Sequence, residues 1–440
     1  MRSMDKNIPV TIFWFRRDLR LDDNAGLYRA LKSGNPVLPI FIFDREILDK
    51  LEDEDDARVT FIYQTIGHIQ QELEKHGSSL LVLYDKAEYA WDKLLKEYKI
   101  AAVYANQDYE PYAKERDKAI AQKLVKQDIE LKTYKDQVIF DGDEVVKNDG
   151  SPYTVYTPYM RKWYETLKPF HLKAYPTKKY FGYLVKTENF KMPLLKEIGF
   201  EKNDLEIPGT NYEDFIKDYA EKRDSPGIKG TSRIGLHLRF GTVSIRELAI
   251  TANGYKEKTW LNELIWREFY MMILDHFPKT MDHAFRPEYD NIKWINDEKQ
   301  FKAWCDGETG FPLIDAGMRE LNATGYMHNR VRMVVASFLT KDLLVDWRWG
   351  ERYFARKLLD YEMASNVGGW QWSAGSGTDA APYFRIFNPD SQLKKFDPDL
   401  IYIKKWVPEY ADFSKYPKPI VDHAFARDRC LKAFKAALAK

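Results

Sequence analysis

Short apolar runs alternate with longer helical segments through the first 135 residues. The runs are rich in β-branched and aromatic residues and occupy positions 10–15, 37–43, 80–84, 101–104 and 131–134. Between them, apolar residues recur with helical spacing over 58–75, 87–98 and 112–125. The runs lack the apolar–polar alternation of half-exposed strands, so each strand is expected to be buried on both faces. This order predicts a parallel, Rossmann-like sheet covered by helices on both sides.

The rest of the chain has a different character. Residues 136–205 carry scattered prolines, lysines and aromatics with weak periodicity, and we interpret them as a long interdomain linker with short, packed helices. From 206 to 440 nearly every segment has the helical period, and no strand-like run stands out. The length exceeds what one core usually holds. We therefore expect an α/β N-terminal domain (1–135), a linker (136–205) and an all-α C-terminal domain (206–440).

The composition restricts the classes of function. A formal net charge of +1 and only two cysteines give no indication of a polyanion partner or a disulfide framework. The eight histidines show no metal-ligand spacing, so no metal is expected. The sequence lacks a secretory leader and any apolar run of about 18 residues, which predicts a cytoplasmic protein without membrane contact. The fingerprint GxGxxG does not follow the first apolar run, which argues against a dinucleotide bound there in that mode.

The segment 261–273, LNELIWREFYMMI, places four unusual side chains on one helical face. Glu263, Trp266, Arg267 and Tyr270 are spaced i, i+3, i+4 and i+7. An acid, an indole, a guanidinium and a phenol together suit a pocket that recognises flat polar rings by stacking and hydrogen bonding. A helix–helix interface with a salt bridge is the alternative explanation.

A second informative helix is expected at residues 325–344, which begin in a polar turn and continue as an apolar run. Asn329, Arg332 and Met333 share one of its faces. Arg332 on such a helix needs a carboxylate partner, because an unpaired buried charge is costly.

The segment 230–233, GTSR, is expected to begin a helix that continues through Leu238. Hydroxyl groups at a helix start, beside free backbone N–H groups, are typical of an anion site. An ordinary helix N-cap explains the same residues.

Residues 361–389 combine glycines with tryptophans. Gly368 and Gly369 precede Trp370 and Trp372, and two further glycines follow closely. Glycine lets the backbone approach a flat ligand or adopt a positive φ angle, so the pattern favours a backbone pressed against a planar cofactor. A glycine-rich turn beside two core tryptophans fits the pattern as well.

Together these segments resemble the photolyase/cryptochrome family, most closely its class I cyclobutane pyrimidine dimer (CPD) DNA photolyases. The resemblance rests on FRRDLRLDDN (15–24), GTSR (230–233), WREFY (266–270) and GTDAAPYFRIFNP (377–389), in matching order and spacing over residues 11–409. It implies light-driven repair of pyrimidine dimers in DNA. In that reaction reduced FAD, excited by blue light, donates an electron to a flipped-out lesion, the cyclobutane ring splits and the electron returns.

The resemblance implies one FAD per chain, held by residues from several segments. It pairs Arg332 with Asp360 and places Asn366 at the reactive edge of the flavin, where a neutral amide suits the reduced form. The residues that it assigns to the cofactor are Tyr219, Thr231, Ser232, Arg233, Ile234, Gly235, Arg332, Asp360, Tyr361, Glu362 and Asn366.

The resemblance also implies a binding site for UV-damaged DNA. Trp266 and Trp372 would form two stacking walls for the lesion, and Glu263 would bind base edges and take part in catalysis. The residues assigned to substrate or DNA are Arg223, Glu263, Trp266, Arg267, Tyr270, Asn329, Arg330, Met333, Trp372 and Gln392. The nearby Lys394 and Lys395 would extend this set as a phosphate-binding rim.

Three tryptophans match the family's electron-relay triad. Trp370 would be the inner step, Trp347 the middle step and Trp294 the exposed terminus. Tunnelling rates fall exponentially with distance, so a buried flavin needs oxidisable steps to reach a reductant at the surface. Core packing is the ordinary explanation for tryptophans in this region, since nine of the 12 lie after residue 259.

In this family the N-terminal domain holds a light-harvesting antenna chromophore. Methenyltetrahydrofolate, a deazaflavin and no chromophore at all stay open for this chain, with Glu110 as the candidate contact. A loop acid before a helix is the alternative explanation of Glu110.

Two other functions are weighed. A cryptochrome-like blue-light photoreceptor is disfavoured by Asn366, by the Trp266 and Trp372 pocket, and by the absence of a long polar tail; a (6-4) photolyase is disfavoured by Asn329 and Met333. We expect a monomer that associates with the nucleoid by binding DNA.

Overall fold

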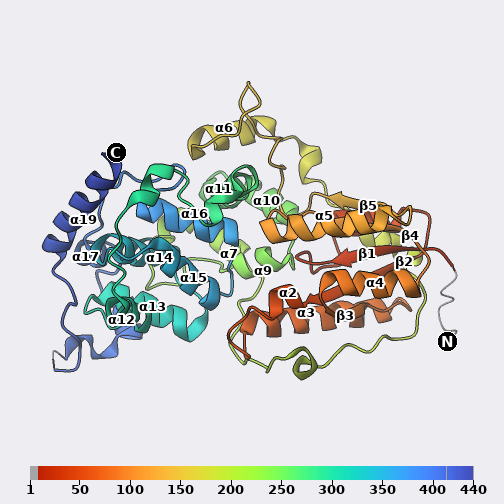
Figure 1. Cartoon of the computed structure of the whole chain (residues 1–440), viewed down its shortest axis with the longest axis horizontal. Helices are drawn as coiled ribbons and strands as arrows, with labels where there is room; N and C mark the ends of the chain where they lie inside the picture. The colour runs from red at the N-terminus through yellow and green to blue at the C-terminus, as the bar shows by residue number, and fades with distance from the viewer. Residues whose placement is uncertain (1–7, 413, 440) are drawn as a thin grey trace. The chain divides into compact units, whose positions relative to one another are not determined.

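The computed structural model describes residues 8–412 and 414–439 (Figure 1). These residues form two compact units. The α/β unit comprises the described residues up to Asp141 together with Leu167–Thr210 and Ile234–Thr251. The helical unit comprises Gly142–Thr166, Asn211–Arg233 and the described residues from Ala252 onward. Each unit therefore draws on several stretches of the chain.

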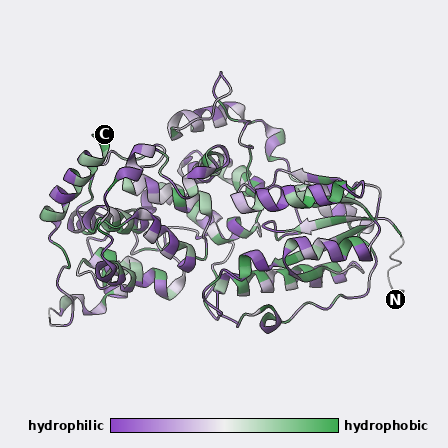
Figure 2. Cartoon of the chain, viewed as in Figure 1, coloured by the Kyte–Doolittle hydropathy of each residue, from purple (hydrophilic) through white to green (hydrophobic). Residues whose placement is uncertain are grey.

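The α/β unit is built on a five-stranded parallel sheet. Its strands are β1 (Val10–Phe15), β2 (Val37–Asp44), β3 (Leu81–Asp85), β4 (Ile100–Asn106) and β5 (Leu131–Tyr134), in the order β3-β2-β1-β4-β5. Ile12 of β1 pairs with Leu38 on one side and with Val103 on the other. Every residue of β1 and β2 is buried, and both strands are mostly hydrophobic in Figure 2. The expected parallel sheet is confirmed.

Helices cover both faces of this sheet. They are α1 (Ala25–Leu31), α2 (Arg45–Leu48), α3 (Ala57–Glu74), α4 (Ala87–Glu97) and α5 (Pro111–Val125). On one face, Trp14 of β1 packs with Trp91 of α4 and Leu124 of α5. On the other, a Cβ added to Gly26 of α1 would lie 2.9 Å from the ring of Phe13. Burial from both sides explains why the strands carry no apolar–polar alternation.

Short elements complete the α/β unit. They are η1 (Pro169–Leu172), η2 (Thr177–Tyr183), η3 (Leu195–Ile198) and α9 (Gly235–Phe240), with most of α10 (Ile245–Gly254).

The helical unit has no strand among its described residues. Its helices are α6 (Tyr156–Thr166), α7 (Glu213–Ile216), α8 (Tyr219–Lys222), α11 (Thr259–His276), α12 (Glu298–Asp306), α13 (Pro312–Thr324), α14 (Asn329–Ser337), α15 (Trp347–Lys357), α16 (Met363–Ala374), α17 (Pro389–Phe396), α18 (Ile401–Trp406) and α19 (His423–Leu438). Single turns η4 (Pro278–Met281), η5 (Pro287–Asn291) and η7 (Pro408–Ala411) connect them. Helix α16 packs against α11, α14 and α15, which places the glycine–tryptophan segment at the centre of the unit.

Several aromatic residues of the expected linker are packed, as the sequence indicates. Tyr156, Tyr159 and Trp163 of α6 are all buried within the helical unit. The indole of Trp163 donates to Glu268 of α11 across 2.6 Å. Helix α6 is therefore attached to the helix that carries the WREFY motif.

Two expected helices differ in extent. The helix expected at 325–344 is α14 followed by a π-helical turn, η6 (Phe338–Asp342); such turns are frequent at functional sites. The helix expected to begin at 230–233 begins instead at Gly235. Arg233 has a positive φ of 53°, a conformation that cannot continue into a helix, so Thr231 and Ser232 lie ahead of the helix rather than in its first turn.

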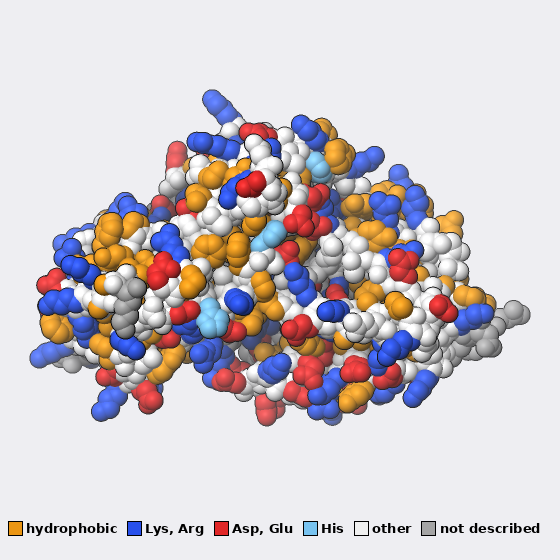
Figure 3. Space-filling view, turned by 45° about the horizontal axis from the view of Figure 1, so that its top comes forward, with side chains coloured by type: hydrophobic (Ala, Val, Ile, Leu, Met, Phe, Trp, Pro, Cys, Tyr) orange, Lys and Arg blue, Asp and Glu red, His pale blue; other side chains and the backbone are white. Residues whose placement is uncertain are grey.

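The surface carries both signs of charge. Basic and acidic side chains are interspersed on the face of each unit seen in Figure 3, in keeping with the net charge of +1. Across the described residues, no helix combines the length and apolar character that crossing a membrane requires.

Candidate functional site

The helical unit contains a cavity of about 410 Å³, a volume typical of small-molecule sites. Helices α11, α14, α15 and α16 supply most of its walls. The lining includes fifteen residues predicted from the sequence: Arg223, Glu263, Trp266, Arg267, Tyr270, Asn329, Arg330, Arg332, Met333, Asp360, Tyr361, Glu362, Asn366, Trp370 and Trp372. Residues that are more than 100 positions apart in the sequence thus meet at one site.

Other predicted residues lie outside this lining. Tyr219, Thr231, Ser232, Arg233, Trp294, Trp347 and Gln392 belong to the helical unit but are not among the residues that line the cavity, whereas Glu110, Ile234 and Gly235 belong to the α/β unit.

The WREFY helix, α11, forms one wall of the cavity. Glu263, Trp266, Arg267 and Tyr270 all line it, as their shared helical face predicts. Leu261 and Ile265 on the opposite face are 1% and 0% exposed. The apolar stripe thus anchors the helix in the core, and the polar and aromatic stripe is left to form the site.

Glu263 is paired with a cation in this wall. Nη1 of Arg223, the residue that follows α8, lies 2.5 Å from Glu263 Oε1. Burial raises the pKa of Glu263, and the nearby guanidinium of Arg223 opposes that rise. Arg223 therefore favours the ionised form of Glu263, which can accept hydrogen bonds.

The cavity lining contains a second set of polar groups. Arg332 of α14 donates through Nη2 to both carboxylate oxygens of Asp360, at 2.9 and 3.1 Å. Its Nε donates to the carbonyl of Met327 at 2.7 Å. The carboxylate partner that the sequence requires for Arg332 is thus Asp360. Close by in the lining, Arg267 of α11 donates to Glu362 at 2.9 Å.

Asn366 is oriented by a residue that the sequence did not single out. Its Nδ2 donates to Glu351 of α15, 3.0 Å from Oε1 and 3.1 Å from the carbonyl oxygen. Burial raises the pKa of Glu351. Both amide hydrogens face α15, which leaves Oδ1 as the acceptor of Asn366. The two residues are fifteen positions apart on different helices, so no periodicity would reveal the pair.

The GTSR segment is tied to α14 through Tyr326. The hydroxyl of Thr231 lies 3.1 Å from that of Tyr326, and the guanidinium of Arg233 lies 4.1 Å from the centre of the same ring. Arg332 lies 5.6 Å from that ring. Tyr326 therefore connects two segments that the resemblance assigns to one cofactor, and sequence reasoning overlooked it.

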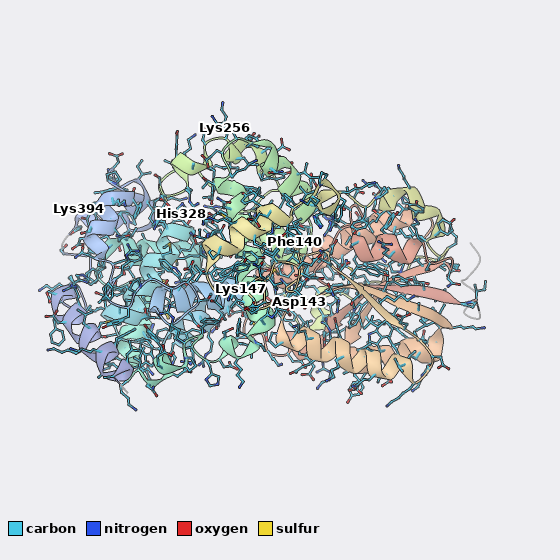
Figure 4. All side chains as sticks on the ribbon, turned by 90° about the horizontal axis from the view of Figure 1, so that it is seen from above. Phe140, Asp143, Lys147, Lys256, His328 and Lys394 are labelled. Carbon is cyan, nitrogen blue, oxygen red and sulfur yellow. The ribbon has the colours of Figure 1, made fainter. Side chains whose placement is uncertain are left out.

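The start of α14 is held by an ion pair, a ring contact and a histidine cap. Arg330 donates to Asp224 at 2.8 Å, and its guanidinium lies 4.5 Å from the ring centre of Phe396. His328 caps α14 by accepting from the backbone N–H of Arg330 at 3.2 Å, and burial lowers its pKa to about 4. In Figure 4 His328 lies among the helices, and Lys394 lies toward the outer side of the same unit. The histidine is neutral and structural in this geometry.

Two of the three relay candidates are buried and the third is partly exposed. Trp370 lines the cavity and is 2% exposed, Trp347 is equally buried, and Trp294 is partly exposed. A Cβ added to Gly350 of α15 would lie 2.1 Å from the ring of Trp370, so the helix that begins with Trp347 packs directly on this indole. Trp304 of α12, which the sequence did not single out, also contacts Trp370, with ring centroids 6.0 Å apart.

The adjacent glycines of α16 have different surroundings. A Cβ on Gly368 would lie 2.3 Å from the ring of Tyr270, whereas a Cβ on Gly369 would meet nothing within 4 Å. Gly369 lines the cavity. One glycine thus permits close packing of α16 on α11, and the other leaves the cavity open.

Glu110, the antenna candidate, lies in an ion-pair network of the α/β unit. It accepts from Arg17 at 3.0 Å and from Arg239. Arg17 also pairs with Asp108 at 3.0 Å. Glu110 is thus ion-paired in this unit, and its role as an antenna contact stays a prediction.

Two family models match the chain: "DNA photolyase" at residues 11–179 and "FAD binding domain of DNA photolyase" at residues 260–415. The deoxyribodipyrimidine photo-lyase of Alkalihalophilus pseudofirmus is 36% identical, over 98% of this chain and 99% of the relative.

Solved structures agree with this finding. A bacterial class III photolyase from Agrobacterium tumefaciens has a TM-score of 0.87 and 34% identity, with all of both chains covered. An archaeal photolyase from Sulfolobus tokodaii, described with two FAD molecules, has a TM-score of 0.84 and 34% identity, with 97% of this chain and 100% of that chain covered. The similarity spans both units, and the chain belongs to the photolyase/cryptochrome family.

Proposed function

We propose that this protein is a deoxyribodipyrimidine photo-lyase, which uses light and FAD to split cyclobutane pyrimidine dimers in DNA. The observation that carries the proposal is a single cavity with two chemically different walls. Trp266 and Glu263 offer an aromatic face and a hydrogen-bonding acid that suit a pair of bases. Arg332, Asp360 and Asn366 offer a cation, an acid and an amide that suit a polar cofactor.

The residues of the cavity fit a flavin. Gly369 presents bare backbone to the open space, so a flat ring can approach α16 closely. Arg332 is neutralised by Asp360, and Asn366 is uncharged with Oδ1 left to accept an N–H group. When bound in its reduced form and excited by light, FAD supplies the electron that opens the cyclobutane ring and accepts it back.

Further residues are proposed to hold the cofactor. Tyr361 and Glu362 line the cavity. Thr231 and Arg233 contact Tyr326, whose ring lies 5.6 Å from the guanidinium of Arg332 in the lining. Roles in cofactor binding for Tyr219, Ser232, Ile234 and Gly235 stay predictions.

The protein's own groups bind and orient the lesion. A dimer stacks and pairs poorly, so extruding it from the duplex costs less than extruding ordinary bases. Trp266 and Trp372 are proposed to stack on it, each contact contributing about 1–3 kcal/mol. Glu263 accepts hydrogen bonds from base edges, and the apolar surfaces of Met333 and the indoles exclude water from the bases.

An electron relay is proposed to start at Trp370. This indole is the relay candidate that lines the cavity. Trp370 and Trp347 are both buried and Trp294 is partly exposed, which supports a path that ends at the surface. The path serves to reduce bound flavin and is not needed once the flavin is reduced.

The second chromophore, the photolyase class and the oligomeric state are further parts of the proposal. A second chromophore is proposed for the α/β unit without a choice of its identity; the archaeal relative is described with a second FAD. The class I assignment stays a prediction, and one of the similar structures is a class III photolyase. We further propose that the protein acts on DNA as a monomer in the cytoplasm.

The decisive test uses purified, reduced protein and an oligothymidine that carries cyclobutane dimers. We expect recovery of thymine absorbance under blue light and none in the dark. A flavin-loaded protein that leaves the dimers intact would contradict the proposal. The same assay on a (6-4) substrate would then separate (6-4) repair from light sensing.

A further inference from the structure

Tyr156 stacks on Trp266. The two ring centroids are 3.6 Å apart and the ring planes differ by 8°. Trp266 lines the cavity, whereas Tyr156 is buried and is not among the lining residues. One face of the indole is thus covered from behind by a phenol, and the contact comes from α6, a segment that no motif singled out.

Tyr156 is itself fixed to the helix that carries Trp266. Its hydroxyl donates to the carbonyl of Asn262 at 2.9 Å, one turn before Trp266 on α11. Its ring meets that of Phe269 edge-on, with centroids 5.9 Å apart. Burial, and then the charge of nearby Glu263, raise the pKa of Tyr156, so its hydroxyl stays a neutral donor.

The start of α6 is also tied to the loop that follows α16. The backbone N–H of Tyr156 donates to Asp379 at 3.2 Å, and the hydroxyl of Thr378 donates to the carbonyl of Thr154 at 2.6 Å. Asp379 has a positive φ of 47°, so the loop has a defined, strained shape. Tyr156 therefore contacts α11, which carries Trp266, and the loop that follows α16, the helix that carries Trp372.

We propose that Tyr156 is a positioning residue for lesion binding: it holds the Trp266 indole in the plane in which a flipped pyrimidine dimer stacks on it. This inference rests on the proposed function and adds a residue to it. An indole free to rotate would have to be ordered on binding, which weakens affinity. With Tyr156 in place the ordering has already occurred in the free protein. Tyr156 does not touch the lesion and acts only through Trp266.

The test measures dark binding of dimer-carrying and undamaged oligothymidine to the full-length, flavin-loaded protein. Tyr156→Leu removes the ring and is expected to weaken dimer binding about 3- to 10-fold, the range of an aromatic pair. Tyr156→Phe keeps the ring and is expected to bind within about twofold of wild type. Tyr156→Met is a second ring-free variant in case the leucine variant does not fold.

Tyr164→Leu is the matched control. Tyr164 lies on the same helix and donates to the side chain of Asn262 at 2.9 Å, but its ring packs against that of Trp163 rather than Trp266. We expect its dimer affinity to be unchanged. If Tyr164→Leu and Tyr156→Leu lose equal dimer affinity, α6 affects binding only by stabilising the fold, and the inference is overturned.

A double-mutant cycle isolates the path through Trp266. In a Trp266→Ala background, Tyr156→Leu is expected to cause no further loss of affinity. If Tyr156→Leu lowers dimer affinity equally with and without Trp266, the inference about Tyr156 is refuted, and the proposed function is not. Near-ultraviolet circular dichroism of the DNA-free protein gives a separate readout, because Tyr156→Leu should change the same band as Trp266→Phe. A wild-type protein without preference for dimer-carrying DNA would instead refute the proposed function, and the role of Tyr156 in lesion binding with it.

Discussion

Arg223 and Glu263 form an ion pair in the wall of the cavity, with Nη1 2.5 Å from Oε1. Burial raises the pKa of Glu263, and Arg223 limits the rise. The ionised carboxylate is the form that accepts hydrogen bonds from base edges. The affinity for dimer-carrying DNA should therefore decrease as the pH falls through the raised pKa.

Arg223→Ala is expected to move this decrease to higher pH, because it removes the charge that favours ionised Glu263. The dissociation constant for dimer-carrying DNA is measured in the dark over a pH series. The pH at which half of the affinity is lost is then compared between wild type and Arg223→Ala. Lys222→Ala is the control, since Lys222 is exposed and pairs with Asp218. Identical pH profiles for Arg223→Ala and wild type would show that the ion pair does not set the charge of Glu263.

Trp370→Phe should prevent photoreduction of oxidised FAD and leave repair by chemically reduced enzyme largely intact. The reason is that Trp370 is the relay candidate that lines the cavity. Flavin absorbance under illumination with an external reductant measures photoreduction. Recovery of thymine absorbance measures repair.

Two further variants test the direction of the path from Trp370. Trp347→Phe should behave like Trp370→Phe, whereas Trp304→Phe should photoreduce normally although Trp304 also contacts Trp370. If Trp304→Phe prevents photoreduction and Trp347→Phe does not, the electron path runs through α12 instead of α15. Equal loss of repair before and after chemical reduction would mean that Trp370 is needed for the repair step itself.

The parts of the fold and site that could be predicted are those that periodicity encodes. Strands buried on both faces, such as β1, are continuous apolar runs. The face of α11 that carries Glu263 and Trp266 follows from the helical period and indeed lines the cavity. The need of Arg332 for an acid follows from the cost of burying a charge, and Asp360 supplies it.

The parts that could not be predicted are tertiary partners. Periodicity shows which way a side chain points, but not what it meets. Asp224 is 106 positions from Arg330, and Tyr156 is 110 positions before Trp266, in a segment interpreted as a linker. Thr231 and Ser232 are good capping residues and predict a helix start that is too early, because the positive φ of Arg233 excludes helix there.

Gly368→Ala and Gly369→Ala form a matched pair in consecutive positions of α16. The first places a Cβ 2.3 Å from the ring of Tyr270 and the second meets nothing within 4 Å. Gly368→Ala should lower the free energy of unfolding by about 1–3 kcal/mol through overpacking. Gly369→Ala should leave it unchanged or raise it by up to about 1 kcal/mol. Urea unfolding measures both, and equal destabilisation would contradict the packing described for Tyr270.

His423 and Asp342 attach the start of α19 to the π-helical turn η6. The hydrogen bond to Asp342 raises the pKa of His423. A histidine whose pKa is higher when folded stabilises the protein below its unfolded pKa of about 6.5, and the contribution is lost as the pH rises through the folded pKa. The difference in free energy of unfolding between wild type and His423→Gln should therefore be largest in mild acid and shrink toward alkaline pH.

Urea unfolding at several pH values checks this expectation for His423. His76→Gln is the control, because His76 is exposed and 3.9 Å from Glu72. A stability difference for His423→Gln that does not vary with pH would mean that the contact with Asp342 stabilises α19 without involving the histidine's charge.

Asp360→Ala would leave the Arg332 guanidinium without its carboxylate in the lining of the cavity. We expect the free energy of unfolding to fall by about 1–3 kcal/mol and purified protein to retain less FAD, measured as the ratio of flavin to protein absorbance. Because the penalty comes from the unpaired cation, the double variant Arg332→Met/Asp360→Ala should recover part of the stability while FAD retention stays low. A double variant that is destabilised by the sum of the two single changes would mean that the two side chains stabilise the fold independently.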